Sequence, residues 1–405
     1  MNVLMISPGY PAEMQRFTRG LAEVGAQVIG FGDQPQAGLD GDVKKSLSAY
    51  FQAESLWDES TSVAQIRRIA DQMQIDRVEC LWEPGMGLAA AFREALGLPG
   101  LTVAQTVPFR DKETMKQVLD HAGIRTPHHY RVRTSDEARE AVEKIGYPVI
   151  VKPIAGAGAT DTYRVDSDEE LDQAIGAVRH VEEVSVEEFV EGEEFTFDTI
   201  CSGGTVHYFN MMWYRPRPLE GKLKEWISPQ AIALRDVDDP KLAAGREMGF
   251  KVLDALQFRT GFTHMEWYLK ADGEAVFGEI GGRPPGANAV ELMNYACDID
   301  VFRGWAEAVV HDRFTQTVER KYNCGIVFKR AQGQGRIRRI DGLDGIVDRF
   351  GPHIARIDLL PVGSPRRDWK QVQISDGFVI VRHPDLQETL GMTDAVANDL
   401  NLYAG

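Results

Sequence analysis

Two acidic residues interrupt apolar stretches in the second half of this 405-residue chain. Glu266 lies within HMEWYL and Glu279 within EAVFGEI, and the turn KADGE joins the two stretches as a strand–turn–strand unit. A carboxylate among apolar residues costs free energy unless a cation balances it. Carboxylates on neighbouring strands are hard oxygen ligands, suited to Mg²⁺ that is also bound by phosphate. The alternative is that both side chains point to solvent, since side chains alternate along a strand.

A loop with an arginine follows the second carboxylate. The sequence GEIGGRPPG ends the strand with glycines and places Arg283 directly before two prolines. Proline fixes φ and lowers the entropy lost when a loop is ordered. This pattern predicts a functional loop that holds one side chain still.

Lysine and glycine residues earlier in the chain have the character of a phosphate site. Lys152 ends the apolar strand YPVIVKP and is followed by the small-residue loop IAGAGATD, which contains Gly156 and Gly158. Such a loop lets backbone N–H groups approach phosphate oxygens, while the lysine supplies charge. Lys112 lies in the first turn of a helix predicted within FRDKETMKQVLDHAGIRTP. Alternatively, Lys152 is a strand-end lysine whose ammonium group simply reaches water.

The acidic stretch VEEFVEGEEF lies between two predicted strands. Glu187 and Glu188 precede Val190, and Glu194 lies seven positions beyond Glu187. A hinge between two sheets can present backbone groups to an adenine edge, and a carboxylate further on can bind ribose hydroxyls. The alternative reading is a solvated acidic turn.

In this order and spacing, the segments resemble the ATP-grasp superfamily over roughly residues 106–310. In that family two lysines contact the nucleotide phosphates, a hinge binds adenine and ribose, and two acidic residues on adjacent strands bind metal. The resemblance assigns nucleotide contacts to Lys112, Lys152, Gly156, Gly158, Glu187, Glu188, Val190 and Glu194, and metal ligation to Glu266 and Glu279. One departure is Gly281, where many ATP-grasp ligases have an asparagine ligand.

Within that superfamily, the four-residue spacing from Glu279 to Arg283 is similar to bacterial L-amino-acid (dipeptide) ligases and carnosine-synthase-like members. The resemblance implies an ATP-dependent ligase that activates a carboxylate as an acyl phosphate and joins it to an amine. Lys152 and Arg283 would be catalytic, with Arg283 stabilising the transferring phosphoryl group or the acyl phosphate. The implied cofactors are ATP and two Mg²⁺ or Mn²⁺ ions, the substrates are small molecules, and a homodimer is the common arrangement.

Two further arginines are candidates for substrate binding. Arg215 and Arg217 lie in WYRPRPLEGKLKEW, a loop expected to shape the acceptor pocket. A guanidinium group binds a carboxylate through two parallel hydrogen bonds. The alternative is that both are ordinary exposed arginines.

Two other functions stay open at this stage. One is an ATP-grasp carboxylase that works through carboxyphosphate, either biotin-carboxylase-like or purine-pathway-like. The other is a non-catalytic nucleotide-binding regulatory protein, suggested by Gly281 and the irregular phosphate loop.

The bulk composition narrows the partners and the location. The net charge of −16 and the pI of about 5.1 disfavour nucleic acid as a partner. Four scattered cysteines indicate reduced packing residues in a cytoplasmic protein. The N-terminus reads as a strand rather than a signal peptide, and no apolar run has the ~20 residues that span a bilayer.

The length of 405 residues suggests two or three domains, which would position these sites. Alternating strands and helices over residues 1–105 predict a Rossmann-like α/β domain with a parallel sheet. Residues 106–310 are predicted to form the ATP-grasp region, with a small lobe at about 125–190 and a large lobe at about 191–310. Residues 311–405 are predicted to form a small α+β domain.

Overall fold

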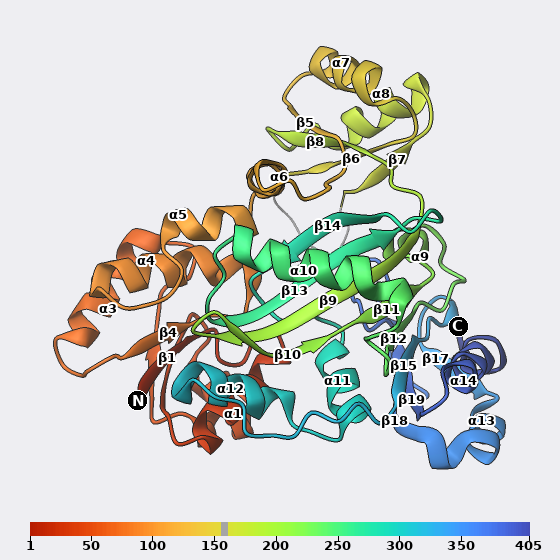
Figure 1. The fold of residues 1–405 in the computed structure, drawn as a ribbon. Coiled ribbons are helices and arrows are strands. Elements are labelled where there is room, and N and C mark those ends of the chain that lie inside the picture. The colour runs from red at the N-terminus through yellow and green to blue at the C-terminus, as the bar shows by residue number, and fades with distance from the viewer. Residues whose placement is uncertain (155–160) are drawn as a thin grey trace.

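The computed structural model describes residues 1–154 and 161–405 (Figure 1). Helices and strands alternate in the N-terminal part and surround antiparallel sheets in the rest of the chain. This architecture agrees with the predicted combination of α/β and α+β units.

The N-terminal part is a four-stranded parallel sheet in the order β3-β2-β1-β4. Its strands are β1 (Asn2–Ile6), β2 (Gln27–Gly32), β3 (Ala49–Gln52) and β4 (Arg77–Glu79). Helices α1 (Met14–Glu23), α2 (Gly41–Ser46), α3 (Glu59–Ala70), α4 (Met86–Leu96) and α5 (Val103–Thr106) accompany it. Strands covered on both faces by helices are apolar throughout, which explains why residues 3–6 are fully buried.

A second, antiparallel sheet has the order β5-β8-β6-β7. It comprises β5 (His129–Val132), β6 (Val149–Pro153), β7 (Tyr163–Val165) and β8 (Val184–Glu188). Helix α6 (Lys112–His121) precedes it, and α7 (Ser135–Ile145) and α8 (Asp168–Ala177) pack on it. In Figure 1 this small lobe stands above the rest of the molecule. Thr134 caps the N-terminus of α7 through a reciprocal capping box with Glu137.

The largest sheet has nine strands in the order β14-β13-β9-β11-β12-β15-β19-β18, with β10 beside β9. Its strands are β9 (Glu193–Ser202), β10 (Thr205–Asn210), β11 (Met212–Arg215), β12 (Gln230–Ala233), β13 (Gly261–Leu269), β14 (Ala275–Gly281), β15 (Asn323–Phe328), β18 (Ile354–Leu359) and β19 (Gly377–His383). Helix α10 (Ala243–Ala255) covers one face (Figure 1). Helices α11 (Ala289–Cys297) and α12 (Val301–His311) lie on the other face, where α12 packs against α1.

The C-terminal residues both extend this large sheet and form a small one. Strands β15, β18 and β19 belong to the large sheet, so hydrogen-bonded strands continue past residue 310. The small sheet is β16-β20-β17, from β16 (Gln332–Gly333), β17 (Ile337–Asp341) and β20 (Asn401–Ala404). Helices α9 (Pro218–Leu223), α13 (Leu343–Phe350) and α14 (Leu386–Asp399) complete the chain. Within the described residues, no helix combines the length and the apolar character needed to cross a bilayer.

The close packing of α10 on the large sheet generates a stability prediction. A Cβ atom at Gly249 would lie 2.4 Å from the Phe197 ring, while a Cβ at Gly391, in the middle of α14, would meet nothing within 4 Å. We expect Gly249→Ala to lower the free energy of unfolding by about 1–3 kcal/mol through overpacking. The matched control Gly391→Ala should raise it by about 0.5–1 kcal/mol, because alanine favours a helix interior. Urea titrations of both variants check this, and a stabilised Gly249→Ala protein would contradict the packing of α10.

Candidate active site

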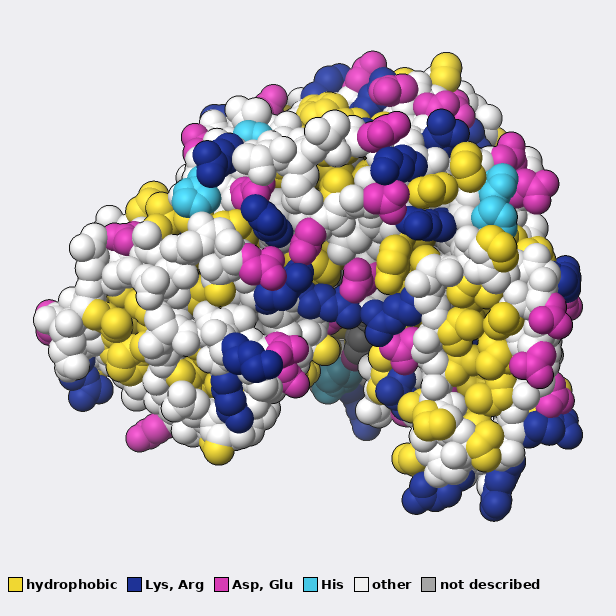
Figure 2. Space-filling model, turned by 90° about the horizontal axis from the view of Figure 1, so that it is seen from below, with side chains coloured by type: hydrophobic (Ala, Val, Ile, Leu, Met, Phe, Trp, Pro, Cys, Tyr) yellow, Lys and Arg dark blue, Asp and Glu magenta, His cyan; other side chains and the backbone are white. Residues whose placement is uncertain are grey.

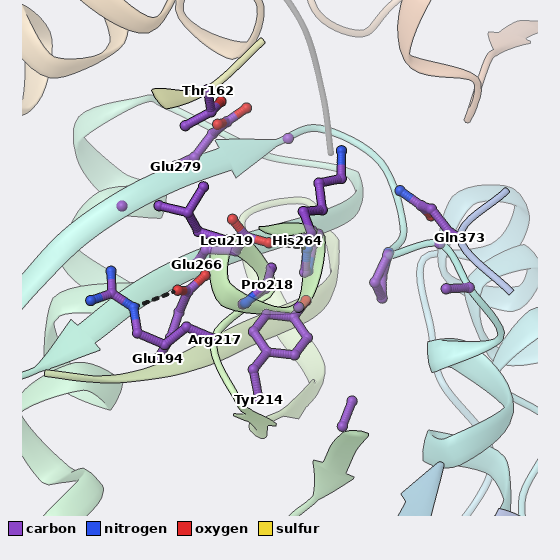
Figure 3. A pocket seen from close by; sticks show the side chains of 18 of the residues that line it. Thr162, Glu194, Tyr214, Arg217, Pro218, Leu219, His264, Glu266, Glu279 and Gln373 are labelled. Carbon is purple, nitrogen blue, oxygen red and sulfur yellow. Dashed lines mark hydrogen bonds and ion pairs between the residues drawn. The ribbon is translucent and has the colours of Figure 1, made fainter. Parts of the chain in front are cut away.

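A cavity of about 510 Å³ lies where the small lobe, the large sheet and the N-terminal sheet meet. Its walls include residues of β6, β8, β9, β13 and β14, together with the loops that follow β4 and β14. Figure 3 shows part of this wall, and in Figure 2 Lys and Arg side chains gather around a central hollow of the molecule. Cavities of this size that lie between domains commonly bind small-molecule ligands.

The carboxylates of Glu266 and Glu279 both line this cavity. They are direct cross-strand partners in the antiparallel pair β13–β14, and a bulge follows Glu266. Cross-strand partners have Cβ atoms only about 5 Å apart. Lys112 Nζ lies 3.1 Å from Glu279 Oε1 and partly balances the charge.

The donor set around these carboxylates fits a metal that is held mainly through phosphate. In the described part of the chain, no three His, Cys, Asp or Glu side chains are grouped to bind a metal by themselves. Gly281 lines the cavity and offers no side-chain ligand. Two carboxylate ligands that leave the remaining positions to phosphate and water are the usual arrangement for Mg²⁺.

His264 is a functional candidate that sequence reasoning missed. Its Nδ1 lies 2.6 Å from Oδ1 of the fully buried Asp198, and its Nε2 lies 3.5 Å from Glu266 Oε1. Burial lowers the pKa of His264, but the Asp198 and Glu266 carboxylates outweigh burial and raise it to about 9. A cationic His264 therefore steadies Glu266. Its position two residues before Glu266, on the same face of β13, was the available signal.

Glu187 binds two lysines. Its carboxylate forms an ion pair with the fully buried Lys116, and its Oε2 lies 2.8 Å from Lys152 Nζ. Burial alone would raise the pKa of Glu187, but the two ammonium groups hold it well below its usual range. The Glu187 side chain, which the resemblance assigns to the nucleotide, therefore binds Lys152 at the cavity wall. Lys116 was missed, although it lies one helical turn after Lys112.

The rest of the hinge lines the cavity, but its side chains have other partners. Both Glu188 carboxylate oxygens lie 2.9 Å from Arg125 Nη2, and the His128 N–H also donates to this carboxylate. The carboxylate expected at the nucleotide is thus engaged elsewhere. Glu194 pairs with Arg217 at 3.1 Å, as drawn in Figure 3. Burial and the neighbouring Glu266 raise the pKa of Glu194 to about 8, against the opposing effect of Arg217.

The structure places the two candidate substrate arginines differently. Arg215 is absent from the cavity wall, and its guanidinium binds Asp394 at 3.2 Å and packs over Trp213. The reason is strand alternation, because Tyr214 on β11 faces the cavity and Arg215 therefore faces away. Arg217 does line the cavity, but it contacts Glu194 and the Val190 carbonyl, on the expected ribose side rather than the acceptor side.

Arg283 lines the cavity and is held by a residue of the N-terminal part. Its Nε and Nη2 lie 3.0 and 2.9 Å from Glu83 Oε2, while Arg110 Nη1 binds the other carboxylate oxygen at 2.6 Å. Glu83 was missed, although it follows the carboxyl end of a parallel strand, where ligands bind in such sheets. Gly156 and Gly158 lie outside the described residues.

Comparison with known proteins agrees with this architecture. Residues 109–213 match the family described as "ATP-grasp domain". The chain therefore carries an ATP-grasp domain, and the resemblance inferred from the motifs is confirmed.

The chain is similar to two curated proteins and to one solved structure. The chain is 26% identical over 234 residues to the L-arginine-specific L-amino acid ligase of Bacillus subtilis. The aligned region covers 56% of each protein. The chain is 32% identical over 142 residues to a D-alanine–D-alanine ligase of Clostridium botulinum, covering 30% of this chain and 47% of that ligase. The chain thus spans about half the length of these curated relatives. The crystal structure of an L-amino acid ligase from Bacillus licheniformis superimposes with a TM-score of 0.80 at 21% identity, over 100% of this chain and 98% of that one. That likeness confirms the predicted fold class.

The buried lysine generates the second prediction. We expect Lys116→Met to lower the free energy of unfolding by about 3–5 kcal/mol, because it leaves Glu187 and Glu113 buried with one cation fewer. The control Lys45→Met removes only an exposed ion pair with Asp42 and should leave stability unchanged. Denaturant unfolding at neutral pH measures both. A Lys116→Met protein as stable as the control would show that Glu187 does not need this lysine.

Proposed function

We propose that this protein is an ATP-dependent carboxylate–amine ligase that acts on amino acids and releases ADP and phosphate. The observation that carries the proposal is one cavity that brings together paired carboxylates, two lysines and a fixed arginine. Similarity to amino-acid ligases over part of the chain supports this choice of reaction.

The reaction begins with phosphoryl transfer. A carboxylate oxygen of the first substrate attacks the γ-phosphorus of ATP, the bond to the bridging oxygen breaks, and ADP leaves. Such a step depends on positioning and charge neutralisation. Lys112 and Lys152 neutralise phosphate oxygens, since Lys152 is fixed by Glu187 and Lys112 lies beside Glu279. Arg283 stabilises the charge on the transferring group.

The second step forms the amide bond. The amine, in its neutral form, attacks the acyl carbon and the bond to the phosphate oxygen breaks. The nitrogen loses one proton, which leaves with the phosphate as HPO₄²⁻. Arg283 stabilises the oxyanion that develops on the former carboxylate oxygen. Glu83, which binds two nitrogens of Arg283, holds this guanidinium in place.

Glu266 and Glu279 are the residues that would hold Mg²⁺ or Mn²⁺, with His264 and Lys112 beside them. Such ions would supply positive charge that offsets the negative charge developing on the phosphate groups. The backbone of Glu188 and Val190 would bind the adenine, and Glu194 the ribose. We further propose that the protein takes a small-molecule carboxylate and an amine as substrates. It would form a homodimer and lie in the cytoplasm.

A screen for ADP release tests the function. We expect ADP to form with at least one pair of amino acids, together with a stoichiometric amount of dipeptide, and EDTA to abolish both. Mass spectrometry detects the product without knowledge of the pair. A bicarbonate requirement without amino acids would favour the carboxylase alternative, and ATP binding without turnover would favour the regulatory one.

Arg283 provides the sharpest mutational prediction. We expect Arg283→Lys and Arg283→Ala to lower kcat by about 10²–10³-fold while the KM for ATP changes little, because oxyanion stabilisers act in the transition state. Lysine should rescue poorly, since a point charge cannot replace a planar fork. Arg349→Lys, on the exposed face of α13, is the matched control. If the KM for the carboxylate substrate rises alone, Arg283 binds that substrate and the assigned role is wrong.

A further inference from the structure

The cations that line the cavity fall into two groups. Those around the expected nucleotide each lie beside a carboxylate, in the pairs Lys112–Glu279, Lys152–Glu187, Arg217–Glu194 and Arg283–Glu83. Lys222, Arg330 and Lys370 line the same cavity, yet none of them forms an ion pair with any residue the structure describes. Over the described residues, this part of the cavity therefore carries positive charge that no ion pair balances.

Arg330 follows β15 and has an unusual set of contacts. Its Nη1 donates to the carbonyl oxygens of Gly221 and Lys224 at 2.8 and 3.0 Å, and its guanidinium lies 4.3 Å from the centre of the Trp369 ring. Its Nε is buried and, over the described ranges, has no hydrogen-bond partner. Burial lowers the pKa of Arg330 to about 10 despite the opposing charge of Glu225. A desolvated donor without a partner is costly unless a ligand supplies one.

Apolar side chains form part of the wall around Arg330, and the nearby Glu225 carboxylate is bound by Arg366. Ile326 and Phe328 precede it on the same face of β15 and also line the cavity. Lys222, one residue after the Gly221 that Arg330 binds, is half-buried, and burial lowers its pKa. Two partly desolvated cations in an apolar wall favour an anionic group on whatever occupies this space.

The same space adjoins the loop that carries Arg283. Residues 368–372 form a helical turn, with the Val372 N–H donating to the Asp368 carbonyl at 2.8 Å. Trp369 and Gln373, four residues apart, therefore lie on one side of that turn. Gln373 Oε1 would be 3.1 Å from a Cβ at Gly286, in the Arg283 loop, and Figure 3 shows Gln373 at the edge of the cavity. Trp369 and Gln373 thus lie between Arg330 and the loop of Arg283 in the cavity wall.

We propose that Arg330, in the cavity wall that also holds Lys222, binds a carboxylate that the amine substrate carries, distinct from the carboxylate that is activated. The inference rests on the proposed ligase reaction, in which Arg283 serves the activated group. The acceptor is then an amino acid, and an amine without a carboxylate is a poor substrate. Nε of Arg330 has no hydrogen-bond partner among the described residues, and Nε and Nη2 form the edge through which a guanidinium binds a carboxylate side-on.

The experiment compares amino acids with their amides as acceptors, for the parent, Arg330→Met and the distant control Arg349→Met. The pairs are glycine and glycinamide, β-alanine and β-alaninamide, and leucine and leucinamide. In the parent and the control, the KM of the amino acid should be at least roughly tenfold lower than that of the amide in one or more pairs, as expected for a charge-assisted hydrogen bond. Arg330→Met should remove this preference and leave the KM for ATP within about twofold. Arg330→Lys should restore part of it.

Three results would overturn the proposal. These are a parent enzyme indifferent to the carboxylate, an Arg330→Met protein whose KM rises equally for acid and amide, and one whose KM rises for ATP. The second result would mean that Arg330 only holds the backbone of residues 221–224 in place. The third would mean that Arg330 binds a phosphate group of ATP. Calorimetric titration of the same pairs, with a non-hydrolysable ATP analogue present, gives the answer without turnover. Failure of the ligase reaction itself, shown by absent ADP release, is thereby distinguishable from failure at Arg330.

Discussion

The pairing of Glu187 with Lys116 and Lys152 determines the cationic side of the cavity. One carboxylate on β8 joins a lysine of α6 to a lysine at the end of β6, so three elements of the small lobe are fixed by a single buried charge. A buried charge of this kind adds little net stability, but removing one partner is expensive. The arrangement therefore imposes a geometry, in which Lys152 is presented to the cavity rather than left to reach water.

The anionic side follows from strand pairing. Antiparallel β13 and β14 place Glu266 and Glu279 opposite each other, and Lys112 and His264 balance them from either side. The N-terminal part contributes Glu83, which holds Arg283 at the same cavity. Charges from all three parts of the chain thus meet at one place, and a polyanion with its metal ions is the ligand that such a mixture accommodates.

Sequence reasoning reached the residues that local pattern identifies. Carboxylates in apolar strands, a lysine at a strand end and an arginine before two prolines were visible from composition and spacing, and all of these side chains line the cavity. Lys116, Glu83 and Arg330 were missed, because their partners lie 71, 200 and roughly a hundred positions away in the sequence. Arg215 does not line the cavity, since its neighbour Tyr214 takes the cavity face of β11.

The fate of the carboxylate oxygen tests the account most directly. The first amino acid of an active pair would be labelled with ¹⁸O in its carboxylate, and the phosphate released with ADP would be analysed by mass spectrometry. Activation as an acyl phosphate requires that one labelled oxygen move from the amino acid to inorganic phosphate in each turnover. Unlabelled phosphate formed together with dipeptide would contradict the account, because the carboxylate would then never have attacked the γ-phosphorus.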